Sequence, residues 1–139
     1  MTSKEIAEQL ESIASADDVV SSTAELTEAW SAANVGVESV EPVLRFMEEH
    51  PELDYGSPGP LVHFIEGHYL KGYEEYKDKL IESVGRRPTI LTVWMLNRVL
   101  NITKEPEKRQ ALVQAMRQAA SNPKTDKATL AGIQIFLSD

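Results

Sequence analysis

The sequence contains no cysteine among its 139 residues. Disulfide bonds and thiolate metal ligands therefore cannot hold the fold together, which excludes the class of small secreted disulfide scaffolds. Because 42% of the residues are hydrophobic and 26% are charged, the chain has enough apolar material for a core stabilised by packing alone. We expect a single domain over residues 1–139.

The sequence also lacks a long uninterrupted apolar run. Its first residues, Met1–Ile6, are polar and amphipathic, unlike the apolar stretch of a signal peptide, and no segment has the roughly 20 apolar residues of a membrane span. The sequence therefore predicts a cytoplasmic protein that has no membrane partner.

Basic residues are scarce in the first part of the chain. Residues 1–55 contain 13 acidic and 2 basic residues (−11), whereas residues 56–139 contain 9 acidic and 12 basic residues (+3), and the whole chain has a formal charge of −8. An acidic excess repels nucleic-acid phosphates, so we expect no nucleic-acid partner and instead a cationic or neutral one. The acidic part is either a solvated helical face or an electrostatic docking surface for a basic partner.

Alternating apolar and polar residues, the pattern of a half-buried strand, are absent as well. Apolar residues instead recur every three or four positions along almost the whole chain, which predicts an all-α fold of about eight helices. Trp30 and Trp94 are expected in the core, and the helix from Thr89 to about Asn101, apolar nearly all round, is expected to be the most central. The predicted helices lie approximately at residues 3–13, 16–33, 40–50, 61–71, 73–84, 89–101, 105–120 and 126–137.

Several residues mark where these helices begin and end. Ser15 and Thr125 are suitable N-caps, and Gly85 stands where a left-handed residue would close a helix. The segment Pro51–Pro60 contains three prolines and two glycines, so it predicts a loop between the third and fourth helices.

An approximate internal repeat follows the prolines. Pro51, Pro88 and Pro123 are 37 and 35 residues apart, and each follows a helix that has apolar residues seven and four positions earlier. A period of this length with two helices per unit is typical of HEAT- or armadillo-like solenoids, in which stacked hairpins share a core. An irregular bundle of helices of similar length would give the same approximate period, and both architectures remain open.

Few residues suggest chemistry. His63, Glu66 and His68 have ligand-like side chains, but His63 and His68 are five positions apart on a predicted helix and point in different directions, which is unsuitable for a metal. No serine stands in a recognisable nucleophile turn, and the glycines of residues 56–60 lack the lysine of a phosphate-binding loop. The sequence therefore predicts a binding protein and no enzyme, with neither a cofactor nor a bound metal.

Acidic and aromatic residues gather near the end of the third predicted helix and the start of the fifth. A tyrosine surrounded by carboxylates suits an interface with lysine and arginine side chains, although glutamates at a helix N-terminus also stabilise the helix dipole. We predict that these residues are exposed, lie along one edge of the stacked hairpins and bind the partner: Glu48, Glu49, Glu52, Asp54, Tyr55, Tyr73, Glu74 and Glu75.

Four segments within residues 59–101 resemble bacterial helical immunity proteins: Gly59–Glu66, Tyr73–Glu75, Ser83–Thr89 and Thr92–Asn101. The resemblance implies a small cytoplasmic protein that neutralises the toxic C-terminal domain of a polymorphic or contact-dependent growth inhibition toxin. The matching residues look structural, with Trp94 expected in the core, and none identifies a binding site.

The sequence thus leaves two functions to be distinguished. The first is an immunity protein that binds one cognate, basic toxin domain and occludes its active or substrate-binding surface. The second is a helical-repeat adaptor or scaffold that binds a peptide or helix of a partner protein on the concave face of the hairpins.

Overall fold

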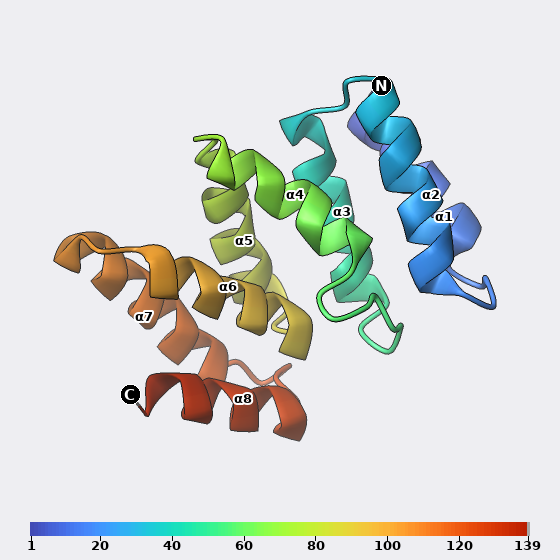
Figure 1. The fold of residues 1–139 in the computed structure, drawn as a ribbon. Coiled ribbons are helices and arrows are strands. Elements are labelled where there is room, and N and C mark those ends of the chain that lie inside the picture. The colour runs from blue at the N-terminus through green and yellow to red at the C-terminus, as the bar shows by residue number, and fades with distance from the viewer. Residues whose placement is uncertain (139) are drawn as a thin grey trace. The chain divides into compact units, whose positions relative to one another are not determined.

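The computed structural model describes residues 1–138, and these residues form eight α-helices and no strand (Figure 1). The all-α prediction is therefore confirmed. A short 3₁₀ turn, Val37–Ser39, precedes the third helix. The helices are α1 Ser3–Ile13, α2 Val19–Ala32, α3 Val40–Glu49, α4 Pro60–Leu70, α5 Glu75–Arg86, α6 Ile90–Ile102, α7 Pro106–Ala120 and α8 Lys127–Leu137.

The chain divides into two compact units, Met1–Tyr76 and Lys77–Asp139, with the boundary inside α5. This boundary separates the charges more sharply than residue 55 does. The first unit contains 16 acidic and 3 basic residues (−13), and the second contains 6 acidic and 11 basic residues (+5). The expectation of a single domain stays a prediction.

In the first unit, two helical hairpins pack on each other (Figure 1). Helix α1 contacts α2 and α3, while α4 contacts α2 and α3, so that the first helices of the hairpins meet and the second helices meet. This pairing is the one that stacked hairpins require. The largest fully buried side chains of α1–α4 are Ile6, Leu10, Trp30, Leu44, Met47, Leu61 and Ile65.

In the second unit, α6 contacts α7 and α8, and α7 also contacts α8. Fully buried side chains here include Leu80, Met95, Leu96, Leu112, Met116 and Ile133. Each proline of the approximate repeat, Pro51, Pro88 and Pro123, lies in the link between two consecutive helices, as the repeat predicts. Membership of all hairpins in one solenoid stays a prediction.

Three of the predicted helix boundaries are wrong in detail. Helix α2 begins after Asp18, whose carboxylate accepts the Ser21 backbone N–H, and not after Ser15. Helix α8 is capped in the same way by Asp126, while the Thr125 hydroxyl donates to the Ala119 carbonyl at the end of α7. In both cases an aspartate shortly after the predicted cap, Asp18 after Ser15 and Asp126 after Thr125, provides a carboxylate that accepts the hydrogen bond more strongly than a hydroxyl.

Glycine 85 does not close α5. The helix continues through Gly85 to Arg86, and the backbone of Gly85 is not left-handed. Two other residues adopt that conformation at helix ends: Asn34 after α2 (φ 57°) and Gly72 after α4 (φ 102°). After each of them the next N–H donates to a carbonyl five residues back, Val35 to Trp30 and Tyr73 to His68, which satisfies groups that the helix leaves unpaired.

The two tryptophans differ in burial. Trp30 is 0% exposed, its indole Nε1 donates to Gln9 Oε1 at 2.7 Å, and its ring meets Phe64 edge-on at 5.4 Å, so its predicted core position is confirmed. Trp94 is only partly buried, and the Arg98 guanidinium lies 5.0 Å from the ring centre. The core prediction for Trp94 is wrong, because Val93, Leu96 and their neighbours occupy the buried face of α6.

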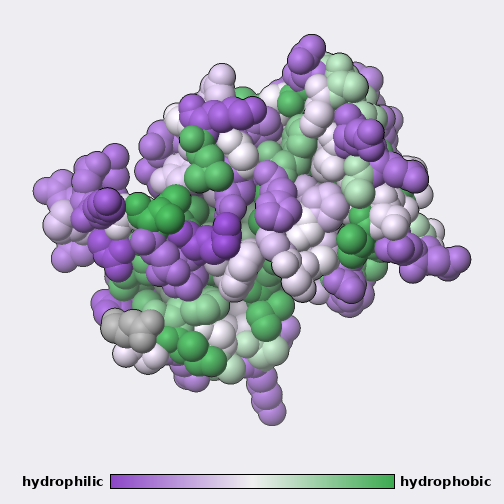
Figure 2. All heavy atoms as spheres, viewed as in Figure 1, coloured by the Kyte–Doolittle hydropathy of each residue, from purple (hydrophilic) through white to green (hydrophobic). Residues whose placement is uncertain are grey.

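None of the helices in residues 1–138 is both long and apolar enough to cross a membrane. On the face drawn in Figure 2, hydrophobic residues occur in small groups between hydrophilic ones. The exposed large hydrophobic residues include Leu70, Tyr73, Ile90, Ile102 and Ile135.

Candidate functional site: the acidic groove between α1 and α3

A groove of about 410 Å³ runs between α1 and α3 in the first unit. It exists because the two helices pack along their buried faces, while the side chains at the edge of that contact are small or charged. We call it the α1–α3 groove. Its lining residues are Ser3, Lys4, Ala7 and Glu11 from α1, and Glu41, Pro42, Arg45, Phe46 and Glu49 from α3.

The apolar part of the groove rests on packed aromatic side chains. Phe46 and Pro42 are buried, and the Phe46 ring packs against the His50 ring (centroids 4.7 Å apart) and edge-on against Tyr55 (6.2 Å). These contacts restrict the rotamer of Phe46. The groove therefore presents a fixed aromatic and aliphatic surface between two rows of charged residues.

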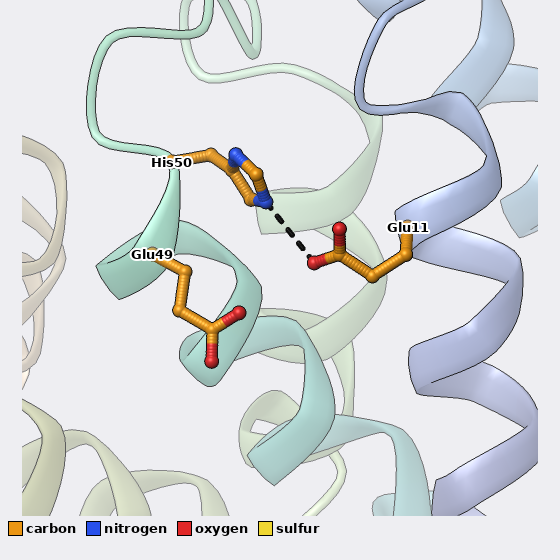
Figure 3. A group of neighbouring side chains, drawn as sticks. All are labelled: Glu11, Glu49 and His50. Atoms are coloured by element: carbon orange, nitrogen blue, oxygen red, sulfur yellow. Dashed lines mark hydrogen bonds and ion pairs between the residues drawn. The ribbon is translucent and has the colours of Figure 1, made fainter.

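Three ligand-type side chains converge at one end of the groove, where α1 and α3 both terminate (Figure 3). His50 Nε2 lies 3.0 Å from Glu11 Oε1, and because a carboxylate only accepts, Nε2 is the donor. One oxygen of Glu49 lies within 4.8 Å of both groups. The other ring nitrogen of His50 faces Glu52 at 3.7 Å, so the imidazole stands between carboxylates from α1 and from the loop after α3.

The electrostatics of this cluster favour a cation. Within residues 1–138, no lysine or arginine is paired with Glu11 or Glu49, and the Glu11 side chain is 53% exposed. Arg45, the nearest guanidinium of the groove, is paired with Glu41 at 3.5 Å. Two carboxylates held close together repel each other, and an added positive charge removes that repulsion.

Two kinds of cation suit these ligands. Two carboxylates and an imidazole are ligand types for divalent metals, so Glu11, Glu49 and His50 are the residues that can hold one. A guanidinium or ammonium group from another protein satisfies the same oxygens and also uses the apolar surface beside them. The groove provides that apolar surface, which a side-chain cation would contact and a metal ion would not.

The structure divides the predicted partner-binding residues. Glu49, Glu52 and Asp54 are exposed. Glu49 belongs to the cluster and Glu52 faces His50, whereas Asp54 accepts the Gly56 N–H in a tight turn. Glu48 and Tyr55 are only 4% and 5% exposed, so the expectation that both are exposed is wrong.

The reason is the fold of the loop after α3. The Tyr55 hydroxyl donates to the His50 carbonyl at 2.8 Å, which draws the ring under the loop against Phe46. Glu48 stands on the buried face of α3 beside Met47 and Leu44. A loop rich in proline and glycine was expected to expose its tyrosine, but here that tyrosine anchors the loop.

The other predicted group lies elsewhere. Tyr73, Glu74 and Glu75 are exposed, as expected, but they follow α4, whereas the loop with Glu52 and Asp54 precedes it. An 11-residue helix is about 16 Å long, so the two groups stand at opposite ends of α4. The prediction that they line one edge together is therefore wrong.

Two members of the cluster were not predicted from the sequence. Glu11 and His50 are 39 residues apart, and nothing in the sequence indicates that α1 packs on α3. One sequence feature could have indicated Glu11: Lys4, Ala7 and Glu11 lie on one face of α1, beside the buried Leu10. The histidines that the sequence did single out lie outside this cluster: His63 is exposed and His68 is buried, and both line a different pocket beside α4.

Comparison with known proteins found no relative: no family model, no curated protein and no solved structure matches the chain.

Proposed function

We propose that this protein is an immunity protein, which binds and neutralises a basic toxin domain by docking the α1–α3 groove onto it. The observation that supports the proposal best is the convergence of Glu11 and Glu49, from two helices, beside an apolar groove in a unit of charge −13. The resemblance of residues 59–101 to helical immunity proteins supports the same function. In this proposal the chain is no enzyme.

The groove fits one arginine or lysine side chain of the partner. The aliphatic stem of such a residue lies along Phe46, Pro42 and Ala7, and its charged end reaches the oxygens of Glu11 and Glu49. A guanidinium fits better than an ammonium, because its planar set of donors binds two carboxylates at once. Such a residue would act as the energetic centre of the interface.

Neutralisation then follows from charge and shape. A toxin that acts on an anionic substrate must present basic residues where that substrate binds. A docked acidic unit covers those residues and competes with the substrate without any chemistry of its own. Glu52 and Asp54 extend the acidic surface beyond the groove.

Co-expression with the toxin domain encoded next to the gene tests the proposal. The native chain is expected to restore growth of cells that produce the toxin and to co-purify with it, whereas the double variant Glu11→Lys, Glu49→Lys is expected to lose both. Treatment with EDTA should leave the complex intact, because a side chain and not a metal bridges the carboxylates.

A matched control separates the groove from overall charge. Glu25 and Glu28 of α2 are exposed and lie outside the groove, so Glu25→Lys, Glu28→Lys changes the charge of the same unit equally. This control should still protect. Equal loss of protection in both double variants would refute the groove, and a native chain that neither binds nor protects would refute the function.

A helical-repeat adaptor is the second candidate. It is favoured by the packing in the first unit, where first helices meet and second helices meet as in a solenoid. An adaptor is expected to bind an isolated peptide of its partner, whereas an immunity protein needs the folded toxin domain. Binding measured with the toxin domain before and after unfolding distinguishes the two functions.

A further inference from the structure

The ligand-type side chains at the end of the α1–α3 groove are close enough together to share one ion. An oxygen of Glu11, an oxygen of Glu49 and a ring nitrogen of His50 all lie within 4.8 Å of one another, and Glu11 Oε1 is 3.0 Å from His50 Nε2. Zinc bonds of about 2.0–2.2 Å at tetrahedral angles place two ligand atoms roughly 3.3–3.6 Å apart. The Glu11 and His50 atoms already have nearly this spacing, and a change of side-chain torsion in the exposed Glu49 brings its oxygen to it.

The His50 ring is held in place for such a contact. It packs on the Phe46 ring with centroids 4.7 Å apart, and the His50 carbonyl accepts the Tyr55 hydroxyl at 2.8 Å. Figure 3 shows the ring turned toward Glu11, which belongs to the other helix. An imidazole that is already ordered loses little conformational entropy when it binds an ion.

A further carboxylate stands on the other side of the same ring. His50 Nδ1 faces Glu52 Oε1 at 3.7 Å. Histidines that bind metals usually donate their second ring N–H to a carboxylate or a carbonyl, which fixes the tautomer and makes the first nitrogen a stronger ligand. Metal binding moves the ring proton from Nε2, where it meets Glu11 in the free chain, to Nδ1, where it meets Glu52. Nε2 then has a lone pair for the ion.

The site is open to solvent and negatively charged. The Glu11 side chain is 53% exposed and Glu49 is exposed, so an ion can enter and keep a water molecule as a further ligand. No lysine or arginine of residues 1–138 pairs with either carboxylate. The charge of −13 on this unit also attracts a cation from a distance.

We propose that Glu11, Glu49 and His50 bind one divalent ion of the zinc type in the free chain, with water as the fourth ligand. The imidazole determines the class of metal, because a nitrogen ligand favours zinc and the neighbouring transition metals, whereas calcium and magnesium favour oxygen ligands. Binding of the ion to the free chain does not depend on the proposed immunity function.

Isothermal titration calorimetry with zinc chloride tests the site, on native chain dialysed against EDTA and then against metal-free buffer. We expect one ion per chain, and an excess of magnesium of about tenfold should not displace it. Nuclear magnetic resonance of the three histidine rings should show a shift of His50 and none of His63 or His68. Absence of binding, displacement by magnesium, or a shift of His63 in place of His50 would overturn the proposal.

Matched variants locate the ion. Glu11→Gln, His50→Gln removes two of the three ligands and should weaken zinc binding by at least about tenfold. Glu25→Gln, His63→Gln makes the same two changes at exposed positions outside the site and should bind normally. Glu49→Gln alters one exposed residue at the end of α3, should also weaken binding by at least about tenfold, and decides the question if the first variant does not fold. Normal binding by Glu49→Gln would refute the three-ligand site.

The ion and a basic residue of a partner need the same carboxylate oxygens, so they exclude each other; this step rests on the proposed function. Zinc should therefore bind the free chain and not the toxin complex, which agrees with the expected resistance of that complex to EDTA. Equal zinc binding by the free chain and the complex would refute docking at the groove and leave the metal site standing. A free chain that binds no zinc but still protects cells would refute the metal site alone.

Discussion

At the scale of single residues, Trp30 shows what a buried aromatic contributes to this fold. It is fully buried, its indole N–H is bonded to Gln9 and its ring packs on Phe64, so three helices meet at one side chain. We expect Trp30→Ala to lower the free energy of unfolding by about 3–5 kcal/mol.

Trp94→Ala is the matched comparison, since that ring is only partly buried and the Arg98 guanidinium lies over it. Its cost should be about 1 kcal/mol. Urea unfolding followed by circular dichroism measures both. A greater loss for Trp94→Ala than for Trp30→Ala would contradict this assignment of the core.

Tyr55 makes stability depend on pH in the alkaline range. Burial raises the pKa of its hydroxyl well above the ordinary value of 10.0, and the negative charges of Glu52 and Glu11 raise it further. In the unfolded chain Tyr55 loses its proton near pH 10, so the unfolded state then binds fewer protons than the folded state. The stability from Tyr55 is therefore complete below about pH 10 and is lost as the pH rises above it.

Tyr55→Phe tests this at the same position. The variant should be about 1 kcal/mol less stable at pH 7, because the hydrogen bond to His50 is lost, and its stability should fall less between pH 10 and 11.5 than that of the native chain. Parallel pH profiles for the two chains would show that Tyr55 does not ionise on unfolding.

At the scale of elements, the link between α3 and α4 depends on Gly59. Its φ is 94°, and a Cβ there would lie 1.6 Å from the Tyr55 carbonyl oxygen, so no side chain fits without moving the loop. We expect Gly59→Ala to destabilise the protein by at least about 2 kcal/mol.

Gly67→Ala is the opposite case, because Gly67 lies inside α4 with open space around it. Alanine has the higher helix propensity, so this variant should gain about 1 kcal/mol. Thermal unfolding of both variants measures the contrast. A tolerated alanine at position 59 would mean that the loop can adopt a second conformation.

The start of α8 depends on Asp126. Its carboxylate accepts the Thr129 N–H at 2.8 Å, and this hydrogen bond lowers its pKa. Asp126→Ala should cost about 1 kcal/mol at pH 7, whereas Asp126→Asn retains an acceptor and should cost less. Because the folded pKa is lowered, the contribution of the charge is present above the ordinary value of 3.8 and is lost as the pH falls below it.

Chemical unfolding at pH 7 and at pH 3 checks both parts of this expectation. The native chain should lose more stability on acidification than Asp126→Asn does. An equal loss in the two chains would mean that the charge of Asp126 adds nothing to the cap.

At the scale of the whole molecule, charge is concentrated in one unit, −13 against +5. Attraction to a basic partner therefore acts over a long range and is screened by salt. Between about 0.1 and 1 M salt, the association rate with the proposed toxin partner should fall by roughly tenfold or more, while the dissociation rate changes little. Surface plasmon resonance at several salt concentrations measures both rates, and a salt-independent association rate would contradict electrostatic docking.

Much of this protein follows from its sequence alone. Apolar residues every three or four positions determine the helices, the prolines and glycines of residues 51–60 determine the loop, and the distribution of acidic residues determines which part is negative. These features are local or additive, because backbone geometry and net charge depend on each residue and its near neighbours.

Contacts between distant residues were decided only by the tertiary structure. The packing of α1 on α3 brings Glu11 to Glu49 and His50, and the fold of the loop buries Tyr55 while α4 separates it from Tyr73. The burial of one tryptophan and the partial exposure of the other were decided in the same way. Periodicity identifies the apolar face of a helix but not the helix that covers it, and that choice depends on the summed packing of the whole chain.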